Sequence, residues 1–277
     1  MKDLNGCFKT AGFLLLCMAL PFISFSQIRD SAQVAAKKAA KQSAEEEKSN
    51  ILVIPFEPAM YNATGDQFIC MKSKMTPGEL SDMIRRSLTS TLVYNMSDVY
   101  NVEEPPNDLA HVNSDLSILY QITKFKTLHK KLKAYYKGYP DRKIWSVFAP
   151  SYSNWGTDCV NDNAQPPNIA NHKFVQAEIT KDSIYSLVCK RYNAHFCLFI
   201  TQWEMMTRFK NCTDLTDQVF QRDIFIHYTL LDKDARFIDG GVVGTTYQST
   251  TNDITKILDK NLGMLTGLLI ERIRTKM

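Results

Sequence analysis

The sequence has few of the features that mark membrane proteins and common enzymes. After residue 26 no stretch is long and apolar enough for a membrane helix, which needs about 20 apolar residues. There is no G-x-S-x-G, H-E-x-x-H, Walker loop or G-x-G-x-x-G opening a helix, and no two of the five histidines lie within four residues of one another. The motifs therefore predict no catalytic residue, no cofactor and no metal site.

Cysteine pairing motifs are also missing. No C-x-x-C occurs among the five cysteines that follow residue 26, which are Cys70, Cys159, Cys189, Cys197 and Cys212. An odd number leaves at least one thiol free or paired between chains, and the sequence leaves the pairing open. Cys197 lies in the apolar run "FCLFI", which predicts a free buried cysteine.

The net charge is small. Of the total of +4, Lys2 and Lys9 against Asp3 supply +1, which leaves 4 − 1 = +3 for the rest of the chain. This excess is too small to imply nucleic acid or an anionic membrane as an obligate partner. The apolar content of 44% is sufficient for a hydrophobic core.

The first 26 residues have the layout of a secretory signal peptide. A basic start precedes the apolar run "AGFLLLCMALPF", and Ser24 and Ser26 stand at the −3 and −1 positions of a cleavage site. Residues 27–49 are rich in helix formers but have almost no apolar stripe, so we expect an exposed tether. An exported protein of periplasm or cell envelope is predicted, with residues 50–277 as one domain.

The periodicity predicts an α/β domain with a mixed central sheet and flanking helices, in the order β-α-β-α-(insert)-α-β-β-β-α. Residues 51–54 read as a strand buried on both faces, ended by Pro55 and followed by an irregular segment to residue 75. A helix is expected from 76, where Thr76 and Glu79 form a capping box around Pro77. A strand at 98–104 and a helix at 107–120 follow.

The second half predicts two short helices within 173–193, a strand from 195 to 206, and a hairpin over 222–247 with its turn at 232–235. Gly240 and Gly241 are expected to bend or bulge the second hairpin strand. The last element is a helix from about 253 to 275, with Asn252 as its cap.

Residues 124–172 predict a long insert whose first part is basic and aromatic. Residues 124–145 hold eight Lys or Arg against one Asp, and a loop of this length is usually functional or disordered. The alternative is a solvated helix face. The candidate contact residues for a partner are Lys130, Lys131, Lys133, Tyr135, Tyr136 and Lys137.

Other residues allow a chemical interpretation beside an ordinary one. His195 and His227 could form a Cys–His pair with Cys197, but a structural histidine and a buried thiol are favoured. Asp232 and Asp234 are favoured as turn residues over an acid–base pair. Trp203 with Glu204 could line a sugar site, and the ordinary interpretation is a half-buried strand end.

Three stretches carry a resemblance to known proteins: "ILVIPF" at 51–56, the helix into strand at 183–206, and the hairpin at 224–241. They resemble an envelope α/β domain found in the curli secretion channel subunit, the lipoprotein activators of penicillin-binding proteins and the amino-terminal domain of the Tol β-propeller protein. More closely, "LFITQWEMMTRFKNCTDL" and "RDIFIHYTLLD" look like uncharacterised exported proteins of the Bacteroidota. The chain lacks a lipobox, and residues 124–171 show no alternating apolar strands of the length that a membrane barrel needs, so channel function is not carried over.

These features together predict a non-enzymatic cell-envelope protein that acts as a binding or accessory module. The expected partner is an envelope protein or an acidic envelope polymer, and nucleic acid is disfavoured by export. A periplasmic hydrolase acting on glycan or peptide is the alternative, and a subunit of an outer-membrane secretion assembly is the third.

Overall fold

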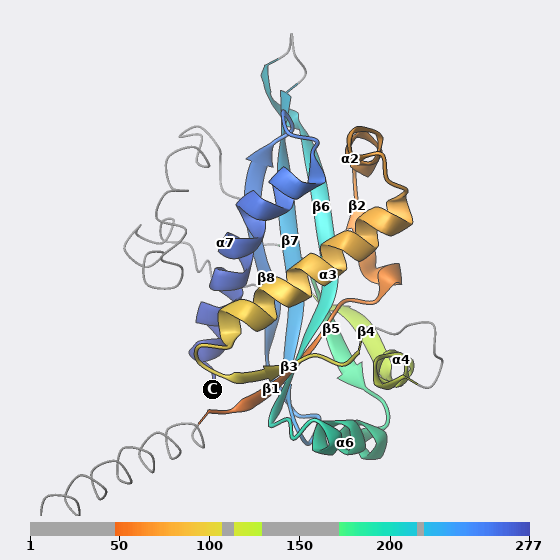
Figure 1. Cartoon of the computed structure of the whole chain (residues 1–277), viewed down its shortest axis with the longest axis vertical. Coiled ribbons are helices and arrows are strands. Elements are labelled where there is room, and N and C mark those ends of the chain that lie inside the picture. The colour runs from red at the N-terminus through yellow and green to blue at the C-terminus, as the bar shows by residue number, and fades with distance from the viewer. Residues whose placement is uncertain (1–47, 107–113, 129–171, 215–218) are drawn as a thin grey trace, which may run out of the picture. The chain divides into compact units, whose positions relative to one another are not determined.

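The computed structural model describes residues 48–106, 114–128, 172–214 and 219–277, and residues Ser49–Met277 form one compact unit. The fold is α/β with a mixed sheet, as predicted (Figure 1). The main sheet runs in the order β3 (Asn101–Glu103), β1 (Asn50–Ile54), β6 (Phe196–Asp214), β7 (Val219–Asp232) and β8 (Phe237–Gln248), with β2 (Tyr61–Ala63) beside β6. A second sheet pairs β4 (Thr123–Leu128) with β5 (Phe174–Ile179).

Helices occupy both sides of the main sheet. They are η1 (Pro58–Met60), α2 (Asp66–Ser73), α3 (Pro77–Met96), α4 (Asp115–Ile122), α6 (Asp182–Arg191) and α7 (Ile254–Arg274). In the part of the chain that the structure describes, no helix has both the length and the apolar character of a membrane span.

The strand β1 is an interior strand, as its sequence predicted. It pairs in parallel with β3 on one side and β6 on the other, and residues 51–54 are all buried. Pro55 follows the last paired residue, and its carbonyl accepts a hydrogen bond from the Tyr120 hydroxyl at 2.7 Å. The chain leaves the sheet only briefly, because β2 pairs with β6 again at Tyr61↔Trp203. The expected irregular segment to residue 75 therefore contains η1, β2 and α2.

The start of α3 has the predicted capping box. The Thr76 hydroxyl accepts from the Glu79 backbone N–H at 3.2 Å, and the Glu79 carboxylate accepts from the Thr76 backbone N–H at 2.8 Å. The predicted cap of α7 is wrong by one residue. Asp253 caps this helix by accepting from the N–H groups of Thr255 and Lys256, whereas Asn252 accepts a hydrogen bond from Arg222.

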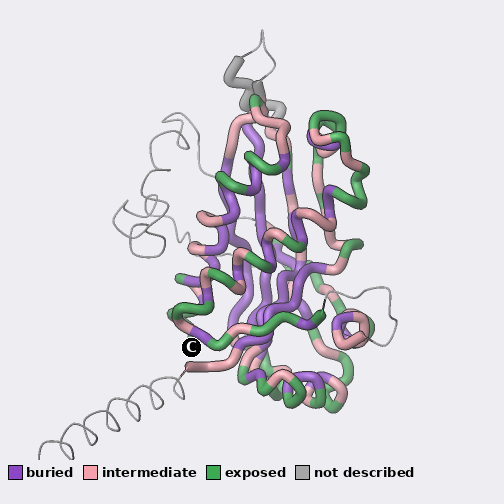
Figure 2. The backbone as a smooth tube through the Cα atoms, in the orientation of Figure 1, coloured by how far each residue is buried: buried purple, intermediate pink, exposed green. Residues whose placement is uncertain are grey.

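One face of the main sheet packs against α3 and α7, which cross in front of β6, β7 and β8 in Figure 1. In this core, apolar side chains from every second position of the strands pack against the apolar stripes of both helices. Figure 2 shows the buried strands behind the half-exposed helices. Its largest side chain is the buried Trp203. Burial of roughly 25 cal/mol per Å² of apolar surface favours this packing.

The opposite face packs against α4, α6 and the β4–β5 sheet. Leu52, Ile54, Cys197 and Phe199 contribute to a second buried cluster with residues of both helices. The predicted first helix within 173–193 is wrong, since Phe174–Ile179 is the strand β5. Its partner β4 begins at Thr123, so the first five residues of the predicted insert at 124–172 belong to this sheet.

The hairpin of β7 and β8 turns where the sequence predicted. The Asp232 carboxylate accepts from the backbone N–H groups of Asp234 and Arg236, both at 2.8 Å, which is the turn role. The predicted bulge at the two glycines is displaced, because the register shifts between Leu230↔Asp239 and Leu231↔Phe237. The predicted signal peptide and all but the last residues of the tether lie outside the described residues.

Candidate functional site

The strand β5 is bound to the main sheet by side chains rather than by a neighbouring strand. On one edge it pairs with β4. On its other edge the backbone N–H of Val175 donates to Nδ1 of His227 at 3.1 Å, and that of Ala177 donates to Oγ1 of Thr229 at 3.0 Å. The Thr201 hydroxyl donates to the Val175 carbonyl at 2.6 Å. These buried polar side chains thus form hydrogen bonds with the backbone N–H and C=O groups on this edge of β5, which would be costly to bury without partners.

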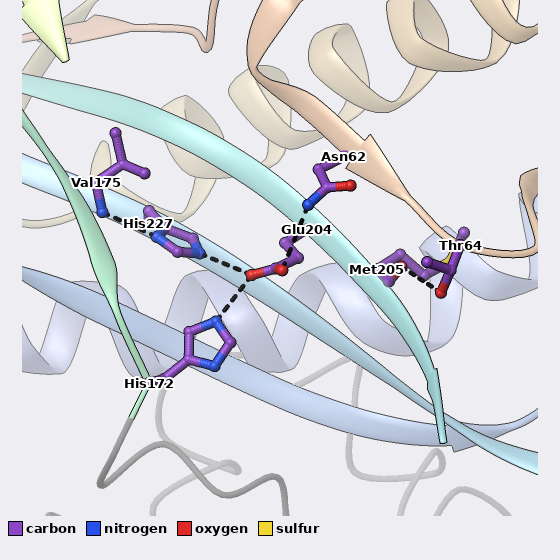
Figure 3. Close-up of polar contacts among 7 residues, drawn as sticks. All are labelled: Asn62, Thr64, His172, Val175, Glu204, Met205 and His227. Atoms are coloured by element: carbon purple, nitrogen blue, oxygen red, sulfur yellow. Dashed lines mark hydrogen bonds and ion pairs between the residues drawn. The ribbon is translucent and has the colours of Figure 1, made fainter. Parts of the chain in front are cut away.

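A cluster of two histidines and one carboxylate lies where β5 begins (Figure 3). We call it the His–Glu–His cluster, made of His172, Glu204 of β6 and His227 of β7. The Nε2 atoms of His172 and His227 lie 2.8 Å and 3.3 Å from the same oxygen, Oε2 of Glu204. The amide of Asn62 on β2 donates to the other oxygen at 3.4 Å. Together with Asn62, the cluster thereby joins β2, β6 and β7 to the chain two residues before β5.

The hydrogen bond from Val175 fixes the proton position on His227. Because Nδ1 accepts a backbone N–H, it cannot carry a proton itself, so the neutral ring holds its proton on Nε2. That Nε2–H then donates to Glu204. Burial lowers the pKa of His227 against the opposing hydrogen bond and charge of Glu204, which keeps this ring neutral.

Glu204 is ionised. Its burial would raise the pKa, but hydrogen bonds from His172 and His227 and the electrostatic interaction of both rings with the carboxylate lower the pKa of Glu204 to about 2. The carboxylate therefore accepts from both rings across the pH range in which proteins normally fold.

An aromatic platform supports His172. Its ring stacks on Phe225 with the ring centroids 4.2 Å apart and an interplanar angle of 22°. Phe225 is buried with Phe174 and Val242. Gly244 makes room for it, since a Cβ at this position would lie 2.7 Å from Cδ1 of Phe225.

A partly buried ion pair lies on the same face of the sheet as the His–Glu–His cluster. The Arg208 guanidinium pairs with the Asp223 carboxylate, whose other oxygen accepts from the Thr246 hydroxyl at 2.7 Å. Burial raises the pKa of Asp223, and the hydrogen bond from Thr246 and the charge of Arg208 oppose this rise. Asp223, Phe225 and His227 alternate along β7 and so share one face.

The His–Glu–His cluster has the residue types of a metal site, and its ligand atoms lie within 4.8 Å of one another. The hydrogen-bond directions do not fit a metal. A ligating histidine offers an unprotonated nitrogen to the metal and donates its other N–H to an acceptor. His227 does the reverse, because its second nitrogen accepts an N–H and its Nε2 is protonated. Metal binding through Nε2 would require the loss of the Val175 hydrogen bond.

The cluster also has no nucleophile among the partners described above. Its hydrogen-bond partners in the described residues are the Asn62 amide and the Val175 backbone, and neither can attack a substrate. The arrangement is suited to holding the start of β5 against β6 and β7.

The candidate residues predicted from the sequence have different outcomes in the structure. Lys130, Lys131, Lys133, Tyr135, Tyr136 and Lys137 all lie outside the described residues. The Cys–His hypothesis is wrong, because the Cys197 sulfur contacts Cys189 and the exposed His195 accepts from the Asn50 backbone N–H at 3.3 Å. His227 is the satisfied structural histidine that was favoured.

The sugar-site hypothesis for Trp203 and Glu204 is also wrong. Trp203 is buried in the core on the α3 and α7 side, whereas Glu204 faces His172 on the opposite side. Sequence reasoning missed His172 and Glu204 as partners. They are 32 residues apart and Glu204 is 23 from His227, so no local spacing signals the cluster.

No protein-family model matches the chain, and no curated protein matches it.

Proposed function

We propose that this chain is an exported, non-enzymatic cell-envelope protein that binds an envelope protein or an acidic envelope polymer through the segment between β4 and β5. The observation that supports this proposal is the pairing of Leu128 with Phe174 at the open end of the β4–β5 sheet. Both ends of this segment, whose first part is basic and aromatic, are therefore held side by side. A binding segment presented from a rigid base loses less freedom when its partner binds.

The base of this segment is firmly held. His172 lies two residues before the start of β5, and it is bound to Glu204 and stacked on Phe225. Three further hydrogen bonds to side chains of the main sheet hold β5 itself. This pattern supports a role in which the sheet carries the segment and the segment makes the contact.

The described strand β4 adds further lysines next to the basic residues of the segment. Lys124 and Lys126 are exposed, and Lys126 forms an ion pair with Glu178 of β5. Exposed lysines on an edge strand also discourage pairing with a further strand. A basic surface next to interleaved aromatics suits an acidic partner, because opposite charges favour encounter and aromatics provide contact area.

A hydrolase that acts on glycan or peptide is the alternative, and the His–Glu–His cluster is the observation that would serve it. A neutral histidine beside a carboxylate could transfer protons. In the cluster, however, the Glu204 carboxylate already accepts from both rings and from Asn62, and its shortest contact, to His172 at 2.8 Å, holds the chain just before β5. If Glu204 acted in catalysis, Glu204→Gln would abolish hydrolysis of envelope glycan or peptide while leaving partner binding intact.

The test reverses the charge of Lys130, Lys131, Lys133 and Lys137 by substitution with Glu. The tagged protein is cross-linked in its own cells, and the purified protein is passed over immobilised polyglutamate with a salt gradient. We expect loss of the cross-linked partner and elution at lower salt. The matched control reverses four exposed lysines on other elements, Lys72, Lys190, Lys256 and Lys260.

The control should keep the partner and bind polyglutamate more strongly than the first variant. Thermal melting of both variants checks that the fold is intact. If the first variant retained every partner and eluted with the control, the segment would not be the contact surface.

A further inference from the structure

Two buried cysteines meet between α6 and the main sheet. Cys189 lies in the last turn of α6 and Cys197 is the second residue of β6, and their Sγ atoms are 3.5 Å apart. Both side chains are buried, and neither forms a disulfide in the structure. The turn between them is tight, because the Ala194 backbone N–H donates to the Cys189 carbonyl at 2.8 Å.

Tyr185 fixes this approach. Its hydroxyl donates to the carbonyl of Asp232 at 2.8 Å, which ties α6 to the end of β7. Its ring stacks with Phe199 of β6 at a centroid distance of 6.5 Å. Two contacts to two strands thus hold the helix so that Cys189 faces Cys197.

The two thiols differ in acidity. The hydrogen bond from Cys197 lowers the pKa of the Cys189 thiol against the opposing effect of burial. The hydrogen bond to Cys189 and burial raise the pKa of the Cys197 thiol well above its usual range. Cys189 is therefore the sulfur that ionises first, and the geometry already places the second thiol beside it.

We propose that Cys189 and Cys197 are a dithiol modification site that closes to a disulfide by exchange with a disulfide-bearing oxidant. A disulfide bond is about 2.05 Å long, so the two sulfurs need to approach by about 1.5 Å from their 3.5 Å separation. The closed bond joins the end of α6 to the start of β6. This inference is independent of the binding role proposed above.

The exchange is balanced in two steps. The Cys189 thiolate attacks one sulfur of the oxidant, forms a mixed disulfide and releases the first oxidant thiolate, which takes up a proton. Cys197 then loses its proton and attacks the Cys189 sulfur, which releases the second oxidant thiolate. Two protein thiols are oxidised to one disulfide, and one oxidant disulfide is reduced to two thiols.

Access to the buried sulfurs sets when the exchange occurs. The helix α6 is ten residues long and exposes Leu187 and Lys190, so it covers the sulfurs from outside. Oxidant reaches Cys189 when α6 is undocked, during folding or in a local opening of the folded chain. Once closed, the bond keeps α6 from undocking.

The test uses the full chain. It is equilibrated under native conditions with oxidised glutathione as the probe, blocked with iodoacetamide and digested with trypsin. Trypsin cuts after Lys181, Lys190, Arg191 and Arg208, which separates peptide 182–190 with Cys189 from peptide 192–208 with Cys197. We expect these peptides linked with the loss of two hydrogen atoms. We also expect the oxidised chain to melt about 3–6 °C above the reduced chain.

The control is Cys70→Ser, since Cys70 is also buried but belongs to the other hydrophobic cluster, on the α3 and α7 side of the main sheet. It should keep both the linked peptides and the melting shift, whereas Cys189→Ser and Cys197→Ser should lose both. If the single variants fail to fold, the wild-type comparison with and without reductant decides. Recovery of peptides 182–190 and 192–208 carrying separate carbamidomethyl or glutathione groups would overturn the proposal.

Discussion

The backbone N–H of Val175 in the small sheet donates to Nδ1 of His227 in the main sheet at 3.1 Å. This contact decides what the His–Glu–His cluster is. It places the imidazole proton on Nε2, where it faces Glu204, and it makes His227 part of the support for β5. The cluster has the residue types of a metal site, but its hydrogen bonds connect the small sheet to the main sheet.

The first prediction concerns metal binding. The folded chain is expected to retain no stoichiometric zinc after dialysis, because binding through His227 Nε2 would break the Val175 hydrogen bond. Metal analysis of the wild type and of His227→Ala should give the same low content. Stoichiometric zinc in the wild type that is lost in His227→Ala would contradict this account.

The second prediction concerns the threonines under β5. Thr229→Val removes the acceptor of the Ala177 N–H in a buried position, so it should lower the free energy of unfolding by about 1–3 kcal/mol. The matched control is Thr89→Val. Thr89 is buried too, but its hydroxyl only donates to the Arg85 carbonyl of its own helix. Urea unfolding should show a smaller cost for the control, and equal costs would argue against the role given to Thr229.

The third prediction concerns acid stability. The pKa of Glu204 is about 2 in the fold and about 4.3 in an unfolded chain. Its contribution is therefore fully present above pH 4.3 and is lost as the pH falls towards 2, and it amounts to up to about 3 kcal/mol. His227 acts in the same direction, since its lowered pKa lets the unfolded chain bind a proton below about pH 6.5 that the folded chain does not take up.

Urea unfolding of the wild type and Glu204→Gln from pH 7 to pH 2.5 measures this contribution. The stability advantage of the wild type should shrink below about pH 4.3. Glu178→Gln, which removes the exposed ion pair to Lys126, is the control and should change stability by less than about 1 kcal/mol. A wild-type advantage that did not change between pH 5 and pH 2.5 would contradict the assignment.

The fourth prediction compares two glycines of β8. Gly244→Ala brings a Cβ within 2.7 Å of the Phe225 ring and 3.1 Å of the Ile224 carbonyl, so it should cost about 1–3 kcal/mol. Gly241→Ala meets the Arg272 guanidinium, a side-chain end that can shift more readily than the Phe225 ring and the Ile224 backbone, at the cost of its hydrogen bond to the Val242 carbonyl. Thermal melting should place Gly244→Ala below Gly241→Ala, and NMR should show a shifted His172 ring signal in Gly244→Ala alone. The reverse order of melting would show that the Phe225 platform is not tightly packed.

Local signals in the sequence were sufficient for several elements. The capping box at Thr76 is confirmed because both partners lie within four residues, and the turn at Asp232 is confirmed because its carboxylate binds its own neighbours. The burial of β1 on both faces is confirmed because four consecutive apolar residues fit an interior strand.

The strand β5 and the cluster could not be predicted in this way. "FVQAEI" is short, and its strand partner within the described residues, β4, is separated from it by the segment between residues 128 and 174. Its other edge is satisfied by His227, Thr229 and Thr201, which are buried polar residues of distant strands. The sequence also gives no sign of the His–Glu–His cluster, because its three residues are distant in the sequence and come together only when the strands pair.

The pairing of Leu128 with Phe174 has a consequence for how this chain can vary. These two residues are fixed next to each other, so they form the two ends of a closed loop. The entropic cost of closing a flexible loop grows only logarithmically with its length, by about 0.6 kcal/mol for each doubling. The stability of the two sheets is thus nearly independent of how much sequence is placed between these two residues. The open end of the β4–β5 sheet is the place where this protein can lengthen, shorten or exchange a segment without refolding the rest.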